Sequence, residues 1–219
     1  MIEGCTAIVM AGGDSQRMGR DKANVTLGEK TLLQTVVATM QQLFPQVIIS
    51  VRQPRAGIDL PQICDEQPDG GPLAGLVASL GQITTPWAFM VACDMPFVVP
   101  EVVELLAGYR FKPPSVPPCQ GGSEFSSPDK GRPGGVLCQA VVPVVHGHPQ
   151  PLAAFYATSC LAPLRASLAA QQKGLRGVLK QLDVRYVDEA EMLEADPLLR
   201  SFFDLDTPQD VEAAMNGVK

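Results

Sequence analysis

The sequence lacks the patterns that mark several common protein classes. Its six cysteines are scattered along 219 residues with no CxxC pair, which argues against a structural zinc site and favours reduced, mostly buried thiols. No window approaches the roughly 20 apolar residues that span a bilayer. The opening MIEGCTAIVMAGG has neither a charged leader nor a signal-length apolar stretch. We therefore expect a cytoplasmic protein with no membrane partner.

Positive charge is also scarce. The chain has 17 lysines and arginines against 23 aspartates and glutamates, a formal net charge of -6 and a pI of about 4.9. This balance argues against broad electrostatic binding to nucleic acid. The composition, 46% hydrophobic and 18% charged, is typical of folded globular proteins. Any site for an anion must therefore be local.

The length suits one substantial core, so we predict a single domain over residues 1–219. Apolar runs predict strands at 5–10, 46–51, around Ile63, and at 87–94, 139–145, 152–156 and 184–187. Helical spacing predicts helices at 31–44, 72–82, in the second part of 95–108, near 159–171 and 174–182, and at 207–215 after a short strand from 202. This order predicts an α/β three-layer sandwich with a mostly parallel, doubly wound sheet.

Local signals refine this prediction at two helix starts and in one insertion. Thr31 and Gln34 can form a capping box, and Thr207 can cap a helix that begins at Pro208. Residues 112–138 are rich in proline, glycine and serine and have no hydrophobic periodicity. They predict a flexible insertion between the halves 1–110 and 139–219, with a lid over a substrate as the alternative.

The stretch AIVMAGGDSQRMGRDK, residues 7–22, places a double glycine and three cations behind the first predicted strand. Gly12 and Gly13 allow the backbone to approach an anion closely, and the lysine and two arginines can offset the charge of a triphosphate. The stretch fits neither GxxxxGK[ST] nor GxGxxG. Composition alone leaves open both a phosphate-binding turn and a glycine turn with solvated charges.

A resemblance to one family favours the phosphate-binding turn. Residues 7–22 are similar to the LAGG-x-RMG-x-DK signature of nucleotidyltransferases that share the nucleotide-diphospho-sugar-transferase fold. Four later segments follow in the order found in the molybdenum cofactor guanylyltransferase family (molybdopterin-guanine dinucleotide biosynthesis protein A): GPLAG at 71–75, CDMPF at 93–97, QPLAAFY at 150–156 and FFDLDTPQD at 202–210. The resemblance covers nearly the whole chain except 112–138. It implies transfer of GMP from GTP to molybdopterin with release of pyrophosphate.

The same resemblance implies roles for individual residues. The nucleotide would be contacted by Met10, Ala11, Gly12, Gly13, Lys22, Asp65, Gly71, Gly75 and Asp94. Arg17, Lys22 and Asp94 would be catalytic. Lys22 would hold phosphate oxygens, Arg17 would act on the phosphates or pyrophosphate, and Asp94 would hold Mg²⁺ at the carboxyl edge of the sheet. The alternatives are an Asx turn at Asp65 and an aspartate that only caps a turn at Asp94.

This chemistry does not demand a general base, because the attacking phosphate is already an anion near neutral pH. The site must align the attacking and leaving oxygens and supply positive charge. Two histidines in the whole sequence are therefore no obstacle. His146 and His148 are expected to be polar turn residues, whereas Gln150 is expected to face the pterin.

Three residues depart from the family pattern. Asp204 and Asp206 stand where asparagines are usual on the pterin side, and Arg52 replaces another asparagine, which puts pterin contacts there in doubt. The aspartates could add a metal ligand beside Asp94 or indicate a different acceptor, and Asp206 could simply precede the last helix. Cytidylyl transfer, nucleotidyl transfer to a sugar or polyol phosphate, and non-catalytic nucleotide binding therefore remain alternatives. Other cofactor-biosynthesis proteins and apo-molybdoenzymes are further candidate partners.

Overall fold

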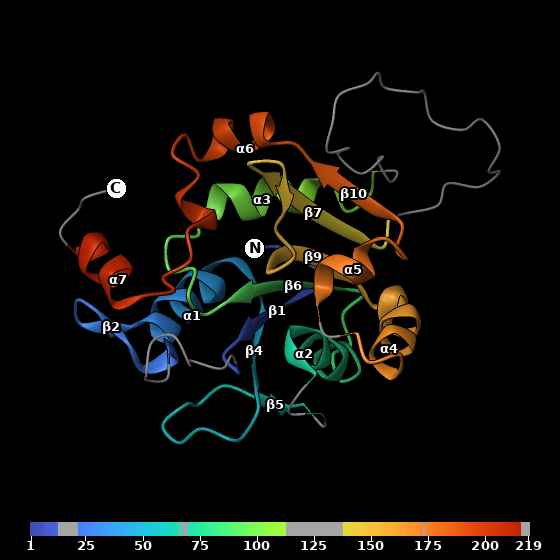
Figure 1. Cartoon of the computed structure of the whole chain (residues 1–219), viewed down its shortest axis with the longest axis horizontal. Helices are drawn as coiled ribbons and strands as arrows, with labels where there is room; N and C mark the ends of the chain where they lie inside the picture. The colour runs from blue at the N-terminus through green and yellow to red at the C-terminus, as the bar shows by residue number, and fades with distance from the viewer. Residues whose placement is uncertain (13–21, 66, 68–69, 113–137, 173, 216–219) are drawn as a thin grey trace.

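One mixed sheet forms the centre of the computed structural model, which describes residues 1–12, 22–65, 67, 70–112, 138–172 and 174–215 (Figure 1). Its strands are β1 (Cys5–Met10), β4 (Gln46–Val51), β5 (Gln62–Cys64), β6 (Trp87–Ala92), β7 (Ala140–Val145), β8 (His148–Pro149), β9 (Ala153–Ala157) and β10 (Val184–Val187). The helices are α1 (Leu32–Leu43), α2 (Gly71–Leu80), α3 (Pro100–Gly108), α4 (Leu161–Ala169), α5 (Leu175–Leu179), α6 (Glu189–Ala195) and α7 (Pro208–Met215). A separate ribbon pairs β2 (Thr26–Leu27) with β3 (Lys30–Thr31).

The strand order is β10-β7-β9-β6-β1-β4-β5, with β8 paired to β7. β1 runs parallel to β4 and β6, β4 to β5, and β7 to β10, whereas β9 is antiparallel to both of its neighbours. Helices cover both faces of the sheet, as Figure 1 shows. The predicted three-layer α/β class with a mostly parallel sheet is therefore confirmed.

Alternation along the strands divides the core between the two faces. In β1, Ala7 and Val9 belong to a cluster that includes apolar residues of α1, α3 and α6, whereas Ile8 belongs to a cluster with residues of α2, α4 and α5. All three residues are fully buried. Burial on both faces explains why this strand reads in the sequence as a continuous apolar run.

The predicted helix starts are confirmed. Thr31 Oγ1 accepts from the Gln34 amide at 3.1 Å while Gln34 Oε1 accepts from the Thr31 amide at 2.9 Å. At α7, Thr207 Oγ1 accepts from the Asp210 amide at 3.2 Å, and Asp210 Oδ2 accepts from the Thr207 amide at 2.9 Å. Each reciprocal pair satisfies backbone donors that the first helical turn leaves open.

Other predictions need correction. β6 ends at Ala92 instead of 94, and a single turn of 3-10 helix, Arg200–Phe202, replaces the short strand expected from 202. The expected helix at 174–182 is only the short α5, and the sequence reading missed α6, β8 and the β2–β3 ribbon. Of the predicted insertion at 112–138, residues 113–137 lie outside the described part of the chain.

The predictions about the cysteines and about membrane-spanning segments can also be compared with the described residues. The thiols of Cys5, Cys93, Cys138 and Cys160 are buried and Cys64 is partly exposed, whereas Cys119 lies outside the described part. Mostly buried thiols are therefore confirmed for these five. Within the same ranges, every helix is too short or too polar to cross a bilayer.

Candidate active site

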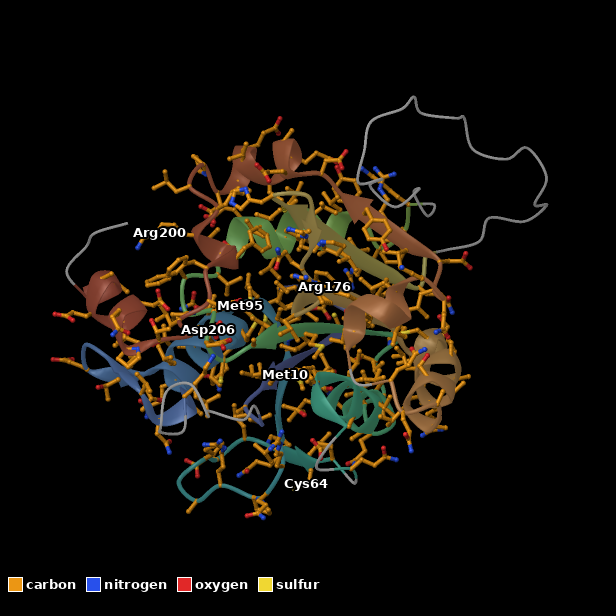
Figure 2. All side chains as sticks on the ribbon, in the orientation of Figure 1. Met10, Cys64, Met95, Arg176, Arg200 and Asp206 are labelled. Atoms are coloured by element: carbon orange, nitrogen blue, oxygen red, sulfur yellow. The ribbon has the colours of Figure 1, made fainter. Side chains whose placement is uncertain are left out.

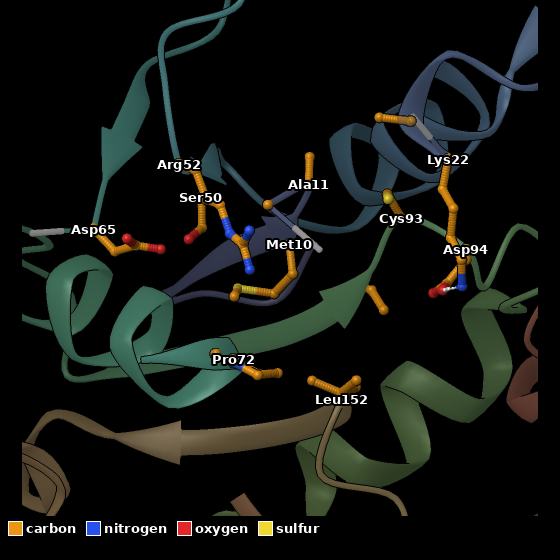
Figure 3. A pocket seen from close by; sticks show the side chains of 14 residues that line it. Met10, Ala11, Lys22, Ser50, Arg52, Asp65, Pro72, Cys93, Asp94 and Leu152 are labelled. Atoms are coloured by element: carbon orange, nitrogen blue, oxygen red, sulfur yellow. Dashed lines mark hydrogen bonds and ion pairs between the residues drawn. The ribbon is translucent and has the colours of Figure 1, made fainter. Parts of the chain in front are cut away.

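A cavity of about 290 Å³ opens at the carboxyl ends of β1, β4 and β6 (Figure 3). Its lining residues are Met10, Ala11, Gly12, Lys22, Ala23, Ser50, Arg52, Asp65, Gly71, Pro72, Ala92, Cys93, Asp94 and Leu152. Parallel neighbouring strands place their carboxyl ends at one sheet edge, which is where ligands bind in open α/β sheets. The structure thus brings together the predicted residues Met10, Ala11, Gly12, Lys22, Asp65, Gly71 and Asp94.

Lys22 and Asp94 face each other at one end of this cavity. Lys22 belongs to a turn of 3-10 helix, Lys22–Asn24, and Asp94 to the turn after β6. Lys22 Nζ donates to Asp94 Oδ2 at 2.8 Å, between side chains that are 18% and 17% exposed (Figure 3). A partly buried cation and a carboxylate therefore stand side by side at the sheet edge.

The C-terminal segment adds a second carboxylate to Lys22. Lys22 Nζ also donates to Asp206 Oδ1, and the side chain of Asp206 is 44% exposed. The Leu205 amide donates to the Asp94 carbonyl at 2.9 Å, which holds the segment against the turn after β6. Figure 2 shows Asp206 beside Met95 of that turn. Leu205 is buried with Val25, Leu32 and Val211, so side-chain packing also holds this segment against the turn after β6.

The charges of Lys22, Asp94 and Asp206 affect the pKa values of Lys22 and of the neighbouring Asp204. Burial alone would lower the pKa of Lys22, but its bonds to Asp206 and Asp94 and the charges of both outweigh burial and raise this pKa. Lost solvation, with repulsion from Asp94 and Asp206, raises the pKa of Asp204 to about 6. Because Asp204 as a whole remains exposed, we attribute much of its shift to the two neighbouring charges.

Asp65 and Arg52 line the cavity on the side away from the Lys22–Asp94 pair, as Figure 3 shows. Asp65 follows β5, and its amide donates to the Val51 carbonyl at 3.2 Å. Its Oδ1 is buried and has no hydrogen-bond partner within the described ranges. Burial raises the pKa of Asp65, and the charge of Arg52 opposes the rise. An acceptor and a donor group therefore face the same space.

The three described glycines of the predicted site have different structural roles. A Cβ on Gly12 would lie 3.3 Å from the backbone nitrogen and Cγ of Arg52, and Gly71 has a φ of +63° at the start of α2. A Cβ on Gly75 would lie 2.5 Å from Met10 Cε and 2.6 Å from Ser50 Oγ. Gly75 is absent from the described lining of the cavity and instead lets α2 pack closely on the strand ends.

The cavity also has lining residues that the sequence did not predict, and two predicted site residues lie outside the described part of the chain. Ser50 and Leu152 line the cavity and had not been predicted; a position at the carboxyl end of β4 was the available signal for Ser50. Arg52 had been noted only as a departure. Gly13 and Arg17 lie outside the described residues. Within the described ranges, no three His, Cys, Asp or Glu side chains form a group that could hold a metal ion, so Asp94 and its neighbours are not a preformed cluster.

A second cavity, of about 390 Å³, lies beside the turn that carries His146. It is lined by Phe97, Val145, His146, Gln150, Leu198, Leu199, Arg200, Phe202, Phe203 and Ala214. Arg200 lies over the Phe97 ring, 4.9 Å from its centroid. His146 and Gly147 both have positive φ, and the His146 amide donates to Glu189, which confirms the predicted polar turn for His146. For His148 the prediction is wrong, because this residue begins β8 and pairs with Val145 of β7.

Comparisons with known proteins agree with this geometry. The model of the MobA-like NTP transferase domain matches residues 7–186. A probable molybdenum cofactor guanylyltransferase of Chloroflexus aggregans is 34% identical over 217 residues, which cover 94% of this chain and 91% of the relative. The crystal structure of molybdopterin-guanine dinucleotide biosynthesis protein A from Archaeoglobus fulgidus is 27% identical, with a TM-score of 0.76 over 96% of this chain and 97% of that one. A Thermus thermophilus 2-C-methyl-D-erythritol 4-phosphate cytidylyltransferase, 15% identical with a TM-score of 0.62 over 97% of this chain and 98% of that one, shares the fold.

Proposed function

The chain belongs to the MobA-like NTP transferase family and is a nucleotidyltransferase, and from this premise we propose that it transfers GMP from GTP to molybdopterin. The products are molybdopterin guanine dinucleotide and pyrophosphate. One observation carries the proposal: a single cavity at the carboxyl edge of the sheet joins the glycine turn at Gly12, the Lys22–Asp94 pair and Asp65, whose Oδ1 has no hydrogen-bond partner among the described residues. Such an edge can hold a nucleotide with its triphosphate at one end and its base at the other.

Residues at the two ends of the cavity bind different parts of the nucleotide. The backbone of Met10, Ala11 and Gly12 lies along the nucleotide, and Asp65 accepts hydrogen bonds at the base end. Lys22 Nζ holds phosphate oxygens at the other end and offsets the negative charge that develops as pyrophosphate leaves. Lys22 must then exchange part of its bonding to Asp94 and Asp206 for bonding to phosphate.

Further parts of the assignment come from the sequence resemblance. Gly13 lets the triphosphate pass close to the turn, and Arg17 acts on the leaving pyrophosphate. Gly71 shapes the base end, where it lines the cavity. Gly75 is proposed to act on the nucleotide through the packing of Met10 and Ser50, since these two side chains lie between it and the cavity.

One or two carboxylates together with phosphate oxygens of a bound nucleotide suit a hard divalent cation, and we propose Mg²⁺. Asp94 offers a carboxylate at the phosphate end of the cavity. Asp206 contacts the same Lys22 nitrogen, so a second carboxylate oxygen is near. When bound, Mg²⁺ supplies positive charge to phosphate oxygens. Asp94 would hold Mg²⁺. Lys22 would bind both the carboxylates and the phosphate oxygens, and so fix their positions relative to one another.

We place the acceptor in the half formed by residues 139–219. The second cavity supports this placement because its lining includes Gln150, the residue expected to face the pterin, and Phe203, next to Asp204. Three phenylalanines and Arg200 provide apolar and cationic surface for a flat heterocycle that carries a phosphate. We propose a cytoplasmic location, and other cofactor-biosynthesis proteins and apo-molybdoenzymes as partners that receive the product.

Release of pyrophosphate tests the proposal. The purified protein is incubated with Mg²⁺ and GTP, with molybdopterin, and with both. We expect pyrophosphate only when both substrates are present, and a product whose mass equals molybdopterin plus GMP minus one water. Nucleotide binding without pyrophosphate release in the complete mixture would instead support a non-catalytic nucleotide-binding protein.

A further inference from the structure

We propose that Arg52 reads the guanine base of the donor nucleotide, its guanidinium donating to O6 and N7 of the ring. This inference rests on the proposed function, because it concerns the base end of the same cavity. It adds a residue that determines specificity and that the family resemblance does not supply, since an asparagine was expected at this position.

The first support is the position of Arg52. The residue follows β4 directly and lines the cavity with Ser50 of the same strand. Its Cγ and backbone nitrogen lie 3.3 Å from where a Cβ on Gly12 would stand, so its stem packs against the glycine turn. Figure 3 shows the guanidinium directed into the cavity from the end of β4. Packing of the stem thus aims the charged head at the space beside the turn.

The second support is the carboxylate that shares this end of the cavity. Asp65 Oδ1 is buried without a hydrogen-bond partner within the described ranges. Arg52 is near enough for its charge to act on Asp65, yet no ion pair joins the two side chains in the described part. A buried acceptor that is left open beside a cation is costly unless a ligand satisfies it. A ligand with adjacent donor and acceptor edges would satisfy Asp65 Oδ1 and offer acceptors to the Arg52 guanidinium.

Guanine has this arrangement. Its O6 and N7 accept hydrogen bonds, which suits a bidentate arginine, and its N1–H and exocyclic amine donate, which suits the Asp65 carboxylate. Adenine and cytosine each present an amine where guanine presents O6, so an amine would face the guanidinium and two donors would oppose each other. The pair Arg52 and Asp65 is therefore complementary to guanine and mismatched to these two bases.

Binding of GTP and of 7-deaza-GTP, in which a carbon replaces N7, tests the role of Arg52. Both are titrated with Mg²⁺ and without acceptor, so the result does not depend on transfer. A hydrogen bond to a charged group is worth at least about tenfold in affinity, so we expect the unchanged protein to prefer GTP by about tenfold. Arg52→Asn should weaken GTP binding by about tenfold or more and remove the preference.

Controls and outcomes separate this inference from the proposed function. Arg176→Asn removes the same charge from an exposed position on α5 and should leave both affinities unchanged. Equal losses for GTP and 7-deaza-GTP in Arg52→Asn would overturn the inference, since they would place Arg52 on the phosphates. If the unchanged protein binds GTP and 7-deaza-GTP with equal affinity, that result alone would overturn the inference. A protein that prefers GTP but forms no dinucleotide would contradict only the proposed transfer.

Discussion

Replacing Lys22 with methionine removes the ammonium group and keeps most of the stem. The bond to Asp94 joins side chains that are 18% and 17% exposed, and a charged hydrogen bond of this kind contributes about 1.5–3 kcal/mol. The bond to Asp206 reaches a side chain that is 44% exposed, so we assign it at most about 1 kcal/mol. The free energy of unfolding should fall by about 2–4 kcal/mol, which a domain stable by about 5–15 kcal/mol survives.

Transfer should suffer more than folding. Loss of one preorganised donor to a developing negative charge typically lowers the rate by about 100- to 1,000-fold, and we expect this for kcat/KM of guanylyl transfer in Lys22→Met. Pyrophosphate release measures the rate and denaturant unfolding measures the stability. Lys30→Met, which removes an exposed lysine of β3, is the matched control and should change neither.

A double variant separates the two effects. Asp206→Asn removes one of the carboxylates that Lys22→Met leaves facing each other, so the double variant should regain part of the lost stability without regaining activity. Guanylyl transfer near the wild-type rate in folded Lys22→Met would refute the reasoning. Activity restored in proportion to stability would show that Lys22 acts only through folding.

Three further predictions concern other parts of the site. Asp94→Ala should lower Mg²⁺-dependent transfer by at least about 100-fold and abolish the thermal stabilisation that Mg²⁺ with GTP gives; retained Mg²⁺-dependent activity would argue against its metal role. Asp204→Asn should stabilise the metal-free protein by about 1 kcal/mol at pH 7.5 and have almost no effect at pH 4, by denaturant unfolding. The folded pKa of Asp204 is raised from 3.8 to about 6, so its contribution to stability is present below 3.8 and is lost as the pH rises through about 6; an equal effect at both pH values would contradict this. Gly75→Ala should raise the KM for GTP severalfold, because the new Cβ displaces Met10 toward the cavity, while helix propensity of about 1 kcal/mol offsets the crowding; an unchanged KM would exclude this coupling.

The sequence predicted the features that depend on local pattern or on neighbouring strands. The apolar run at Cys5–Met10 and the capping box at Thr31 needed only short-range information. Lys22 and Asp94 follow β1 and β6, which are adjacent and parallel, so their meeting at one sheet edge follows from the α/β order. The fold class and the cavity at the carboxyl ends of β1, β4 and β6 can therefore be predicted from the sequence.

Contacts that depend on packing between distant parts of the chain could not be predicted from the sequence. The alternation in FFDLD resembles a strand, but Leu205 is buried in a small cluster with Val25, Leu32 and Val211 instead of joining the sheet. That packing, with the hydrogen bond from Leu205 to the Asp94 carbonyl, brings Asp206 to Lys22 from 184 positions away. Similarly, nothing local indicates that Gly75 meets Met10.

Product identity in a mixture of donors tests the central claim most directly. The purified protein is incubated with molybdopterin, Mg²⁺ and equal concentrations of GTP and CTP, and the dinucleotide formed is identified by mass. A product that is almost entirely molybdopterin guanine dinucleotide is the predicted result. A predominant cytosine dinucleotide, or no dinucleotide although pterin and nucleotides are intact, would contradict the assignment of this site to guanylyl transfer.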